Sequence, residues 1–339
     1  GGSEPCCALC AAGYSPVLAS PQSPTSRARA DAQATRRVIR RQLWARAVRM
    51  RDFYLLLSTA LVLLFVFKYI PMYGVLIAFK EYNIVDGILR SPWTLKWFEW
   101  LFTDVFFLRA LRNTVILSAL KILFLFPAPI IFALLLNEVR GTGYKRTIQS
   151  ISYLPHFMSW VVLGGIFREI LSMQRGAFPA LMELLGLEPL NVLISPGAFR
   201  GLLIITGAWQ GIGWGAIVYL AALTAIDPEL YESGAVDGAN RWQMAIYITI
   251  PALLPVATIL LLLQLGNMLE NGIDQVLIFY NDVLAETADI IETLVYRSGI
   301  LSARYSYATA AHLLQNGVGI TLLLGANAVV RRYNEYGVL

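Results

Sequence analysis

Long apolar stretches separated by short polar segments make up most of the chain, and this alternation limits what it can fold into. Six stretches reach the about 20 residues that a helix needs to cross the hydrocarbon core of a membrane. They are approximately Phe53–Tyr73, Asn113–Leu136, Ile148–Leu171, Phe199–Leu223, Ile250–Leu269 and Ala308–Val330. Of the 339 residues, 57% are apolar and only 14% are charged, whereas soluble domains carry about 25% charged residues. The sequence therefore predicts an all-α integral membrane protein with six spans.

Basic residues gather at three places that six crossings put on one side of the membrane. They are Arg36, Arg37, Arg40, Arg41, Arg46, Arg49 and Arg51 before the first span, Arg140, Lys145 and Arg146 after the second, and Arg331 and Arg332 after the sixth. The segment before the sixth span has the opposite bias, with Asp274, Asp282, Glu286, Asp289 and Glu292 against Arg297 and Arg304. Cytoplasmic loops of membrane proteins carry an excess of Lys and Arg. We therefore expect both termini to be cytoplasmic.

The N-terminal segment differs in composition from the remainder. Residues 1–45 are rich in Ala, Ser, Pro and Arg, which predicts a disordered basic cytoplasmic tail ahead of a membrane domain over residues 46–339. Cys6, Cys7 and Cys10 are too crowded for a disulfide framework, and no Cys/His pair downstream completes a zinc site. A lipidated or metal-binding tail is the alternative. The formal charge of +5 resides in the tail and loops, so it does not indicate a nucleic-acid partner.

Prolines interrupt two of the predicted spans. Pro127 and Pro129 lie within the second span, and Pro155 lies early in the third. A proline removes a backbone donor from the helical ladder, and membrane helices tolerate this where neighbouring helices satisfy the freed groups. The sequence therefore predicts a helical bundle with bent members.

A polar segment, residues 225–251, separates the fourth and fifth spans and is predicted to be cytoplasmic. Asp227 is a good N-cap and Pro228 suits the first helical position, so a helix begins here. Glu229 and Glu232 occupy its opening turns, where the helix dipole favours acids. A small amphipathic helix with no bilayer to bury it is expected to dock into a partner protein. A helix lying flat on the membrane is the alternative.

This segment resembles the signature of permease subunits of bacterial binding-protein-dependent ABC importers, which reads Glu-Ala-Ala, three residues, Gly, nine residues, Ile-x-Leu-Pro. Glu232-Ser233-Gly234 stands for the triplet, Gly238 for the glycine and Ile248-Thr249-Ile250-Pro251 for the end, with all spacings kept. The departures are small residues for the alanines and Ile for Leu. "YIPMYGVLIAFKEYN", "SYLPHFMSWVVLGGIF", "IIETLVYRSGI" and "YSYATA" are similar to the branch that imports oligo- and polysaccharides. The resemblance covers the chain from Phe53 onward.

The resemblance implies a six-span bundle like the maltose and methionine permeases, in the bacterial cytoplasmic (inner) membrane. Its implied partners are a second homologous permease, an ABC ATPase dimer, an extracytoplasmic solute-binding protein, membrane lipid and an oligosaccharide substrate. The residues implied in coupling to the ATPase are Glu229, Glu232, Ser233, Gly234, Ala235, Gly238, Ala239 and Pro251. ATP and Mg would bind the partner ATPase and no cofactor this chain. The sequence agrees, because it contains no G-x-x-x-x-G-K-[ST] phosphate-binding loop. We therefore expect no enzymatic activity.

Polar residues inside membrane spans are costly and often face a water-filled path. Asn267, Glu270, Asn271 and Asp274 fall at i, i+3, i+4 and i+7, which predicts one helical face at the outer end of the fifth span. The other candidates for a sugar path are Gln210, Gln264, Gln315, Asn316 and Lys121. A solvated helix end or a hydrogen-bonded helix seam is the alternative. Lys121 would suit an acidic, alginate-type glycan.

Two other classes of membrane protein compete with this interpretation. A self-sufficient secondary transporter usually contains inverted repeats and intramembrane ion sites, and no clear internal repeat is visible in the sequence. A membrane scaffold or assembly protein would have no substrate path. Dependence of transport on a separate ATPase distinguishes the first interpretation from both alternatives.

Overall fold

The computed structural model describes residues 50–139 and 141–333. The predicted tail, residues 1–45, lies outside these residues. Within the described residues all regular secondary structure is helical, apart from one isolated β-bridge between Lys80 and Trp93. The chain divides into two compact units, residues 1–73 and 74–339, which are described separately.

The first unit contains the start of the first membrane span. Its elements are α2 (Arg51–Leu64), the π-helical turn η1 (Phe65–Tyr69) and α3 (Ile70–Met72). The apolar helix runs from Arg51 to Phe79, which is 29 residues and long enough to cross a bilayer. None of its most apolar window is buried within the chain, and Phe53 and Phe67 are each 70% exposed. A helix that is apolar on all sides and unburied fits a lipid environment.

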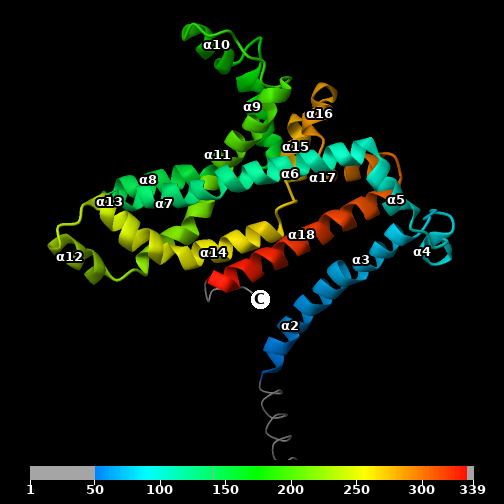
Figure 1. The fold of residues 1–339 in the computed structure, drawn as a ribbon, viewed down its shortest axis with the longest axis horizontal. Coiled ribbons are helices and arrows are strands. Elements are labelled where there is room, and N and C mark those ends of the chain that lie inside the picture. Colours follow the sequence, from blue (N-terminus) through cyan, green and yellow to red (C-terminus); the bar gives the residue numbers. More distant parts are fainter. Residues whose placement is uncertain (1–49, 140, 334–339) are drawn as a thin grey trace, which may run out of the picture. The chain divides into compact units, whose positions relative to one another are not determined.

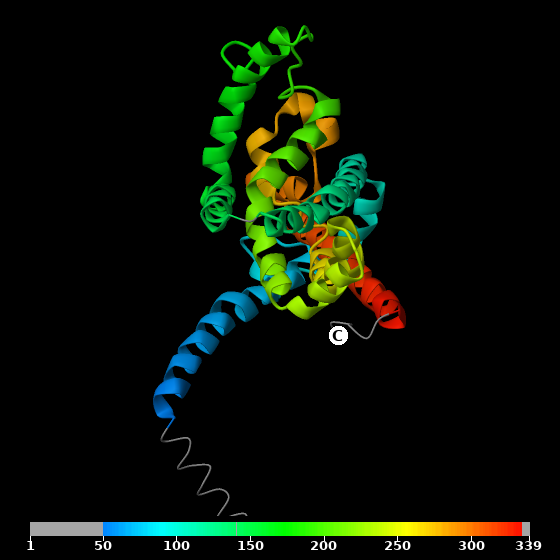
Figure 2. The same ribbon diagram turned by 90° about the vertical axis from the view of Figure 1, so that its left-hand side faces the viewer.

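The second unit is a bundle of long helices joined by short ones. Its elements are η2 (Tyr73–Phe79, which begins in the first unit), α4 (Gly87–Arg90), α5 (Lys96–Thr103), α6 (Val105–Leu125), α7 (Pro127–Asn137), α8 (Thr142–Tyr153), η3 (Leu154–Phe157), α9 (Trp160–Leu171), α10 (Ala177–Leu184), α11 (Pro196–Thr224), α12 (Pro228–Val236), α13 (Arg241–Met244), η4 (Ala245–Thr249), α14 (Ile250–Gly266), α15 (Ile273–Phe279), η5 (Asp282–Leu284), α16 (Ala285–Ala288), α17 (Ile291–Val295), η6 (Tyr296–Leu301) and α18 (Tyr305–Tyr333). In this unit α14 packs along α18, and α7 packs along α11 (Figures 1 and 2).

Five helices of the described chain are long and apolar enough to span a membrane, and a bent pair brings the number to six. The predicted bend in the third span is confirmed, because Thr142–Phe157 and Trp160–Leu171 meet at an angle of 103°. The break follows Pro155 and comes where Ser159 starts a new helix by accepting a hydrogen bond from the Val162 N–H, 3.4 Å. Proline and a new N-cap together end one helix and begin the next. Counting the pair as one span gives the six-span fold.

Three apolar clusters hold the second unit together, and α6 and α11 take part in more than one of them. One joins Leu117 of α6 and Leu203 of α11 to Val276 of α15 and Ile290. A second packs α5, α6 and α17 against α18, and a third packs α7 and α11 against α14. The polar segment between α14 and α18 is therefore held against α6 and α11, where the candidate site forms.

Candidate functional site

The loop between the fourth and fifth spans is built by local hydrogen bonds. The prediction that a helix begins at Asp227 is confirmed, because its carboxylate accepts from the Glu229 N–H at 3.0 Å. The helix, α12, ends in a Schellman turn, in which the Ala239 N–H donates to the Gly234 carbonyl at 2.9 Å. Gly238 forms the turn with φ +78°. This left-handed conformation strains any residue with a Cβ, so the glycine of the signature is required by the backbone.

Beyond the turn the chain is fixed to the start of the fifth span. Asn240 and Gln243 form a reciprocal capping box, with bonds of 2.9 and 2.8 Å, which starts α13. The Tyr231 hydroxyl lies 3.0 Å from the buried Thr249 hydroxyl. A Cβ on Gly234 would lie 3.3 Å from Ile248 Cδ1, so α12 packs closely on the turn that leads into α14. The loop is therefore packed and hydrogen-bonded onto the start of the fifth span, so the two are expected to move together.

The outer surface of this loop is exposed although the loop is well ordered internally. Among the predicted coupling residues, Glu229, Glu232, Ser233, Ala235, Gly238 and Pro251 are exposed, and Gly234 and Ala239 are half-buried. Val236 is 88% exposed and Trp242 is 77% exposed. Arg241 pairs with Glu138 at 3.0 Å, which joins the loop to the end of the second span. Exposed large apolar side chains on a fixed loop mark a surface that meets a partner protein or the membrane.

The predicted helical stripe at the end of the fifth span is wrong. α14 ends at Gly266, and α15 begins only at Ile273 after Gly272, whose φ is +72°. Asn267, Glu270, Asn271 and Asp274 therefore do not share a helical face; Asn267, Glu270 and Asp274 are exposed, whereas Asn271 is buried.

Contacts with α6 explain why the helix stops. The Asn271 amide donates to Ser118 Oγ at 3.0 Å, and the Lys121 ammonium donates to the Asn271 carbonyl. Lys121 also donates to Gln275 Oε1 at 3.2 Å. Carbonyl and amide oxygens stabilise a cation that lies between helices. In a regular helix the backbone carbonyl would instead accept a hydrogen bond from a backbone N–H of the same helix. These tertiary bonds outweigh the helical ones.

Four of the predicted path residues converge on one cavity. The cavity measures about 310 Å³ and is lined by Ser118, Lys121 and Ile122 of α6 and by Leu263, Gln264, Asn267, Met268 and Glu270. Lys121, Gln264, Asn267 and Glu270 thus lie together, although not through the predicted stripe. The result is a polar cavity at the end of the fifth span, with one cation and one carboxylate in its walls.

The other candidates lie apart from this cavity. Gln315 is buried and donates to the Leu269 carbonyl at 2.7 Å. Gln210 donates to the Met158 carbonyl at 3.5 Å, which places it beside the bend in the third span. Asn316 is exposed. The side-chain N–H groups of Gln315 and Gln210 therefore have protein partners, whereas the buried Gln315 amide oxygen has none within the described residues.

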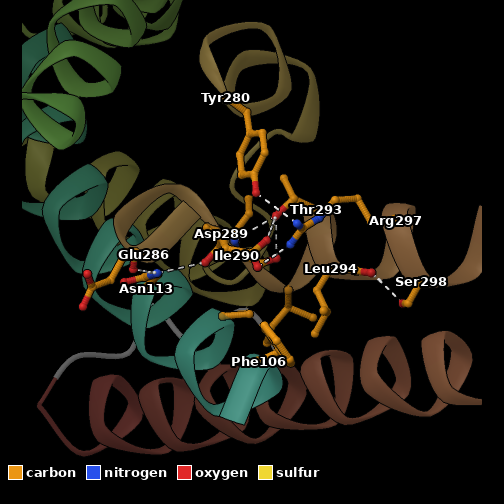
Figure 3. A network of polar contacts seen from close by, with 12 residues as sticks. Phe106, Asn113, Tyr280, Glu286, Asp289, Ile290, Thr293, Leu294, Arg297 and Ser298 are labelled. Carbon is orange, nitrogen blue, oxygen red and sulfur yellow. Dashed lines mark hydrogen bonds and ion pairs between the residues drawn. The ribbon is translucent and has the colours of Figure 1, made fainter. Parts of the chain in front are cut away.

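Figure 3 shows a buried polar network that the sequence analysis missed. Asn113 of α6 donates to the Glu286 and Asp289 carbonyls at 2.8 and 3.0 Å. Its own oxygen accepts from Arg200 of α11 at 3.1 Å. Asn113 is only 1% exposed, so this side chain joins two spans to the segment that precedes the sixth.

The second half of the network fixes α17. The Asp289 carboxylate accepts from the Thr293 hydroxyl at 2.7 Å and pairs with Arg297 (Figure 3). Arg297 also donates to the Tyr280 hydroxyl at 2.9 Å. The available sequence signal was the run of Asn113, Thr114, Ser118 and Lys121 in the second span, because polar residues in a span mark its buried side.

Glu292 extends this polar region outside the membrane-spanning helices. Burial raises its pKa to about 7, and the repulsion of Glu270 and Asp274 acts in the same direction. The Asn271 N–H donates to this carboxylate at 3.2 Å. This hydrogen bond and the charge of Lys121 lower the pKa and so oppose the effect of burial. The carboxyl group therefore changes charge near neutral pH beside the cavity.

A bundle of apolar helices, an ordered but exposed loop and a polar cavity at a broken helix define a membrane transport protein. Residues 125–293 match the family described as binding-protein-dependent transport system inner membrane component. The polygalacturonan/rhamnogalacturonan transport system permease protein YteP of Bacillus subtilis (strain 168) is 38% identical over 309 residues, which cover 91% of this chain and 96% of YteP. Protein LplB of the same organism is 41% identical over 286 residues, covering 84% of this chain and 90% of LplB.

A solved structure agrees with these sequence relatives. A chain of a bacterial ABC transporter involved in the import of the acidic polysaccharide alginate superposes with a TM-score of 0.79 at 39% identity. The match covers 86% of this chain and 99% of that chain. The present chain belongs to the family of inner membrane components of binding-protein-dependent transport systems. It is a multi-pass permease subunit of an ABC importer, so the predicted family and fold are confirmed.

Proposed function

We propose that this permease carries oligo- or polysaccharides across the bacterial inner membrane, together with a second homologous permease subunit. The observation that carries the proposal is the position of α14. The helix has the exposed loop with Tyr231 and Gly238 at its start and the cavity with Gln264 at its end. Movement imposed on the loop therefore reaches the cavity through one helix.

The work of the cycle is divided between subunits. An ABC ATPase dimer binds ATP and Mg, contacts the loop around α12 and closes. This chain itself hydrolyses no ATP. A solute-binding protein delivers the sugar to the extracytoplasmic side. The relatives support this division, since one solved alginate transporter with a TM-score of 0.80 was crystallised with an alginate-pentasaccharide-bound periplasmic protein. Both termini of the present chain then lie in the cytoplasm, with membrane lipid around the spans.

The substrate class follows from the cavity and from the relatives. Sugar hydroxyls can bind to the amide groups of Gln264 and Asn267 and to the carboxylate of Glu270 in this cavity. Lys121 uses two of its three N–H donors on Asn271 and Gln275 and keeps a third for a carboxylate. The names of two relatives refer to the acidic polymers polygalacturonan and alginate. We therefore propose an acidic glycan.

Reconstitution tests the proposed function. The chain, its second permease, the ATPase dimer and the binding protein are placed in proteoliposomes, and uptake of labelled oligogalacturonides is measured with and without ATP. Uptake that requires ATP and all subunits is expected. Uptake by this chain alone would instead indicate a secondary transporter, and failure to copurify with an ATPase would contradict the assigned coupling.

Lys121→Gln tests the acidic part of the proposal. The variant keeps a donor for the Asn271 carbonyl but loses the charge, so uptake of oligogalacturonides should fall by about tenfold, the equivalent of one charge-assisted hydrogen bond. Uptake of neutral arabino-oligosaccharides, if the importer accepts them, should change less. Unchanged uptake of the acidic oligosaccharide would remove the acidic assignment and leave the importer assignment intact.

Tyr231→Phe tests the connection between the loop and the fifth span. The variant removes only the hydroxyl that bonds Thr249, so the complex should assemble and hydrolyse ATP while the sugar carried per ATP falls. Tyr247→Phe is the matched control, because Tyr247 is 77% exposed and is not among the hydrogen-bonded side chains of the described chain. Equal coupling in both variants would show that the Tyr231–Thr249 contact transmits no movement.

A further inference from the structure

A second polar cavity lies between three segments of the second unit. It measures about 390 Å³ and is formed by the end of α9, residues 191–194 and residues 279–281. The polar side chains in its walls are Arg168, Glu169, Gln174, Asn191, Tyr280 and Asn281. α9 and α15 pack side by side here (Figure 1). These segments follow the third span and the fifth, so the predicted topology puts the cavity on the extracytoplasmic side.

One wall of this cavity is held in place by bonds to the surrounding chain. Arg168 donates to the Ile278 carbonyl. The Asn281 side chain donates to the Leu193 carbonyl at 2.9 Å and accepts from the Leu284 N–H at 3.0 Å. Tyr280 is fixed by Arg297, whose guanidinium lies 5.2 Å from the ring centroid (Figure 3). These groups are pre-organised, which lowers the entropy lost when a ligand binds.

The cavity also carries polar groups that the fold does not use. Within the described residues, the side chains of Glu169 and Asn191 make no hydrogen bond, and the Gln174 amide oxygen accepts only from Ser172 at 3.2 Å. The Gln174 N–H groups are therefore available. Fixed groups together with free amide and carboxylate groups are expected of a binding site rather than of a packed interface.

We infer that this cavity binds a sugar unit of the incoming oligosaccharide outside the membrane, an inference that rests on the proposed function. The two amides donate and accept hydrogen bonds and the carboxylate accepts them, which matches sugar hydroxyls, and Tyr280 supplies an aromatic surface for the ring. Arg168 and Glu169 balance in charge, so hydroxyl groups dominate recognition. The volume lies in the about 300–1,000 Å³ range of small-molecule sites. This cavity would hold a part of a long oligosaccharide that lies outside the cavity around Lys121.

The test compares substrates of different length on the complete transporter. Asn191→Ala and Gln174→Ala are assembled with all partner subunits in proteoliposomes, and uptake of a galacturonide disaccharide and a pentasaccharide is measured. The KM for the pentasaccharide should rise about tenfold, as expected for lost sugar hydrogen bonds, while the KM for the disaccharide stays the same. Glu183→Gln, on exposed α10 outside the cavity, is the control and should change neither.

The outcomes separate this inference from the proposed function. Equal KM values for both substrates in the variants and the wild type would overturn the subsite. An equal rise for both lengths, with weaker stimulation of the ATPase by the sugar-free binding protein, would show a docking surface for that protein and also overturn it. If the wild-type transporter imports no oligosaccharide, the proposed function itself fails. The amount of assembled complex confirms that each variant folds.

Discussion

The loop at residues 227–251 and the network around Asn113 and Asp289 are both polar, but they are built in opposite ways. In the loop, the caps and the Tyr231–Thr249 contact join residues at most 18 positions apart. The Arg241–Glu138 ion pair is the exception. In the network, Asn113 reaches a carbonyl 173 positions away. The loop leaves its outer side chains exposed, whereas Asn113 and Asp289 are at most 2% exposed.

This difference separates two tasks. Local bonds fix the backbone of the loop, so its surface stays available for the ATPase subunit proposed above. Long-range bonds connect polar groups of α6, α11 and the segment around α17, so those groups hold these elements together. We therefore expect substitutions in the network to lower stability first, and substitutions in the loop to lower transport first.

The largest effect is expected from Asp289→Ala. The substitution removes the carboxylate that binds Arg297 and Thr293, although the Arg297 side chain is 37% exposed and Thr293 keeps the Ile290 carbonyl as an acceptor. Losing these hydrogen bonds to a charged group should lower the free energy of unfolding by about 3 kcal/mol. Thermal unfolding of the purified chain in detergent measures the loss. Asp282→Ala is the matched control, because Asp282 is exposed, and its change should stay within about 0.5 kcal/mol. Equal shifts for the two variants would show that the network does not hold the spans.

The next effect is a dependence of stability on pH that comes from Glu292. Burial raises its pKa from 4.5 to about 7, so the folded chain holds this proton more tightly than the unfolded chain. The resulting stability is fully present below pH 4.5 and is lost as the pH rises through about 7. The rise in pKa sets an upper limit of about 3 kcal/mol, which partial exposure of the side chain reduces.

Glu292→Gln checks this expectation. The variant keeps an oxygen that can accept from the Asn271 N–H but carries no charge at any pH. Unfolding midpoints measured between about pH 5 and pH 8 should fall with rising pH in the wild type and vary less in the variant. Identical pH profiles would place the titrating group elsewhere.

The smallest change in stability, but a large change in transport, is expected from Gly238→Val. A Cβ at φ +78° costs about 1–2 kcal/mol and distorts the turn that presents α12. Uptake in the reconstituted transporter should fall while the complex still forms. Gly186→Val is the matched control, since Gly186 has φ +71° and open space around it, as Gly238 has, but lies outside the loop. If both variants lose the same uptake, strain alone and not coupling explains the result.

Much of the fold could be predicted from the sequence because the signals concerned are local. The apolar stretches are long enough to span a membrane, Asp227 and Pro228 start α12, and the signature glycine Gly238 has the left-handed backbone that a turn needs. Each of these features depends on neighbours within a few positions, so a single sequence displays it.

Only the tertiary structure decided where the fifth span ends and which polar residues meet. A 3.6-residue period predicted one face for Asn267, Glu270, Asn271 and Asp274, but Lys121 and Ser118 bind Asn271 and the helix stops at Gly266. The sequence by itself determined the class of protein, its spans and the turn at Gly238, because caps and apolar length act between near neighbours. The cavities and the Asn113–Asp289 network were decided by tertiary contacts, because a buried polar group takes whichever partner the packed helices bring to it.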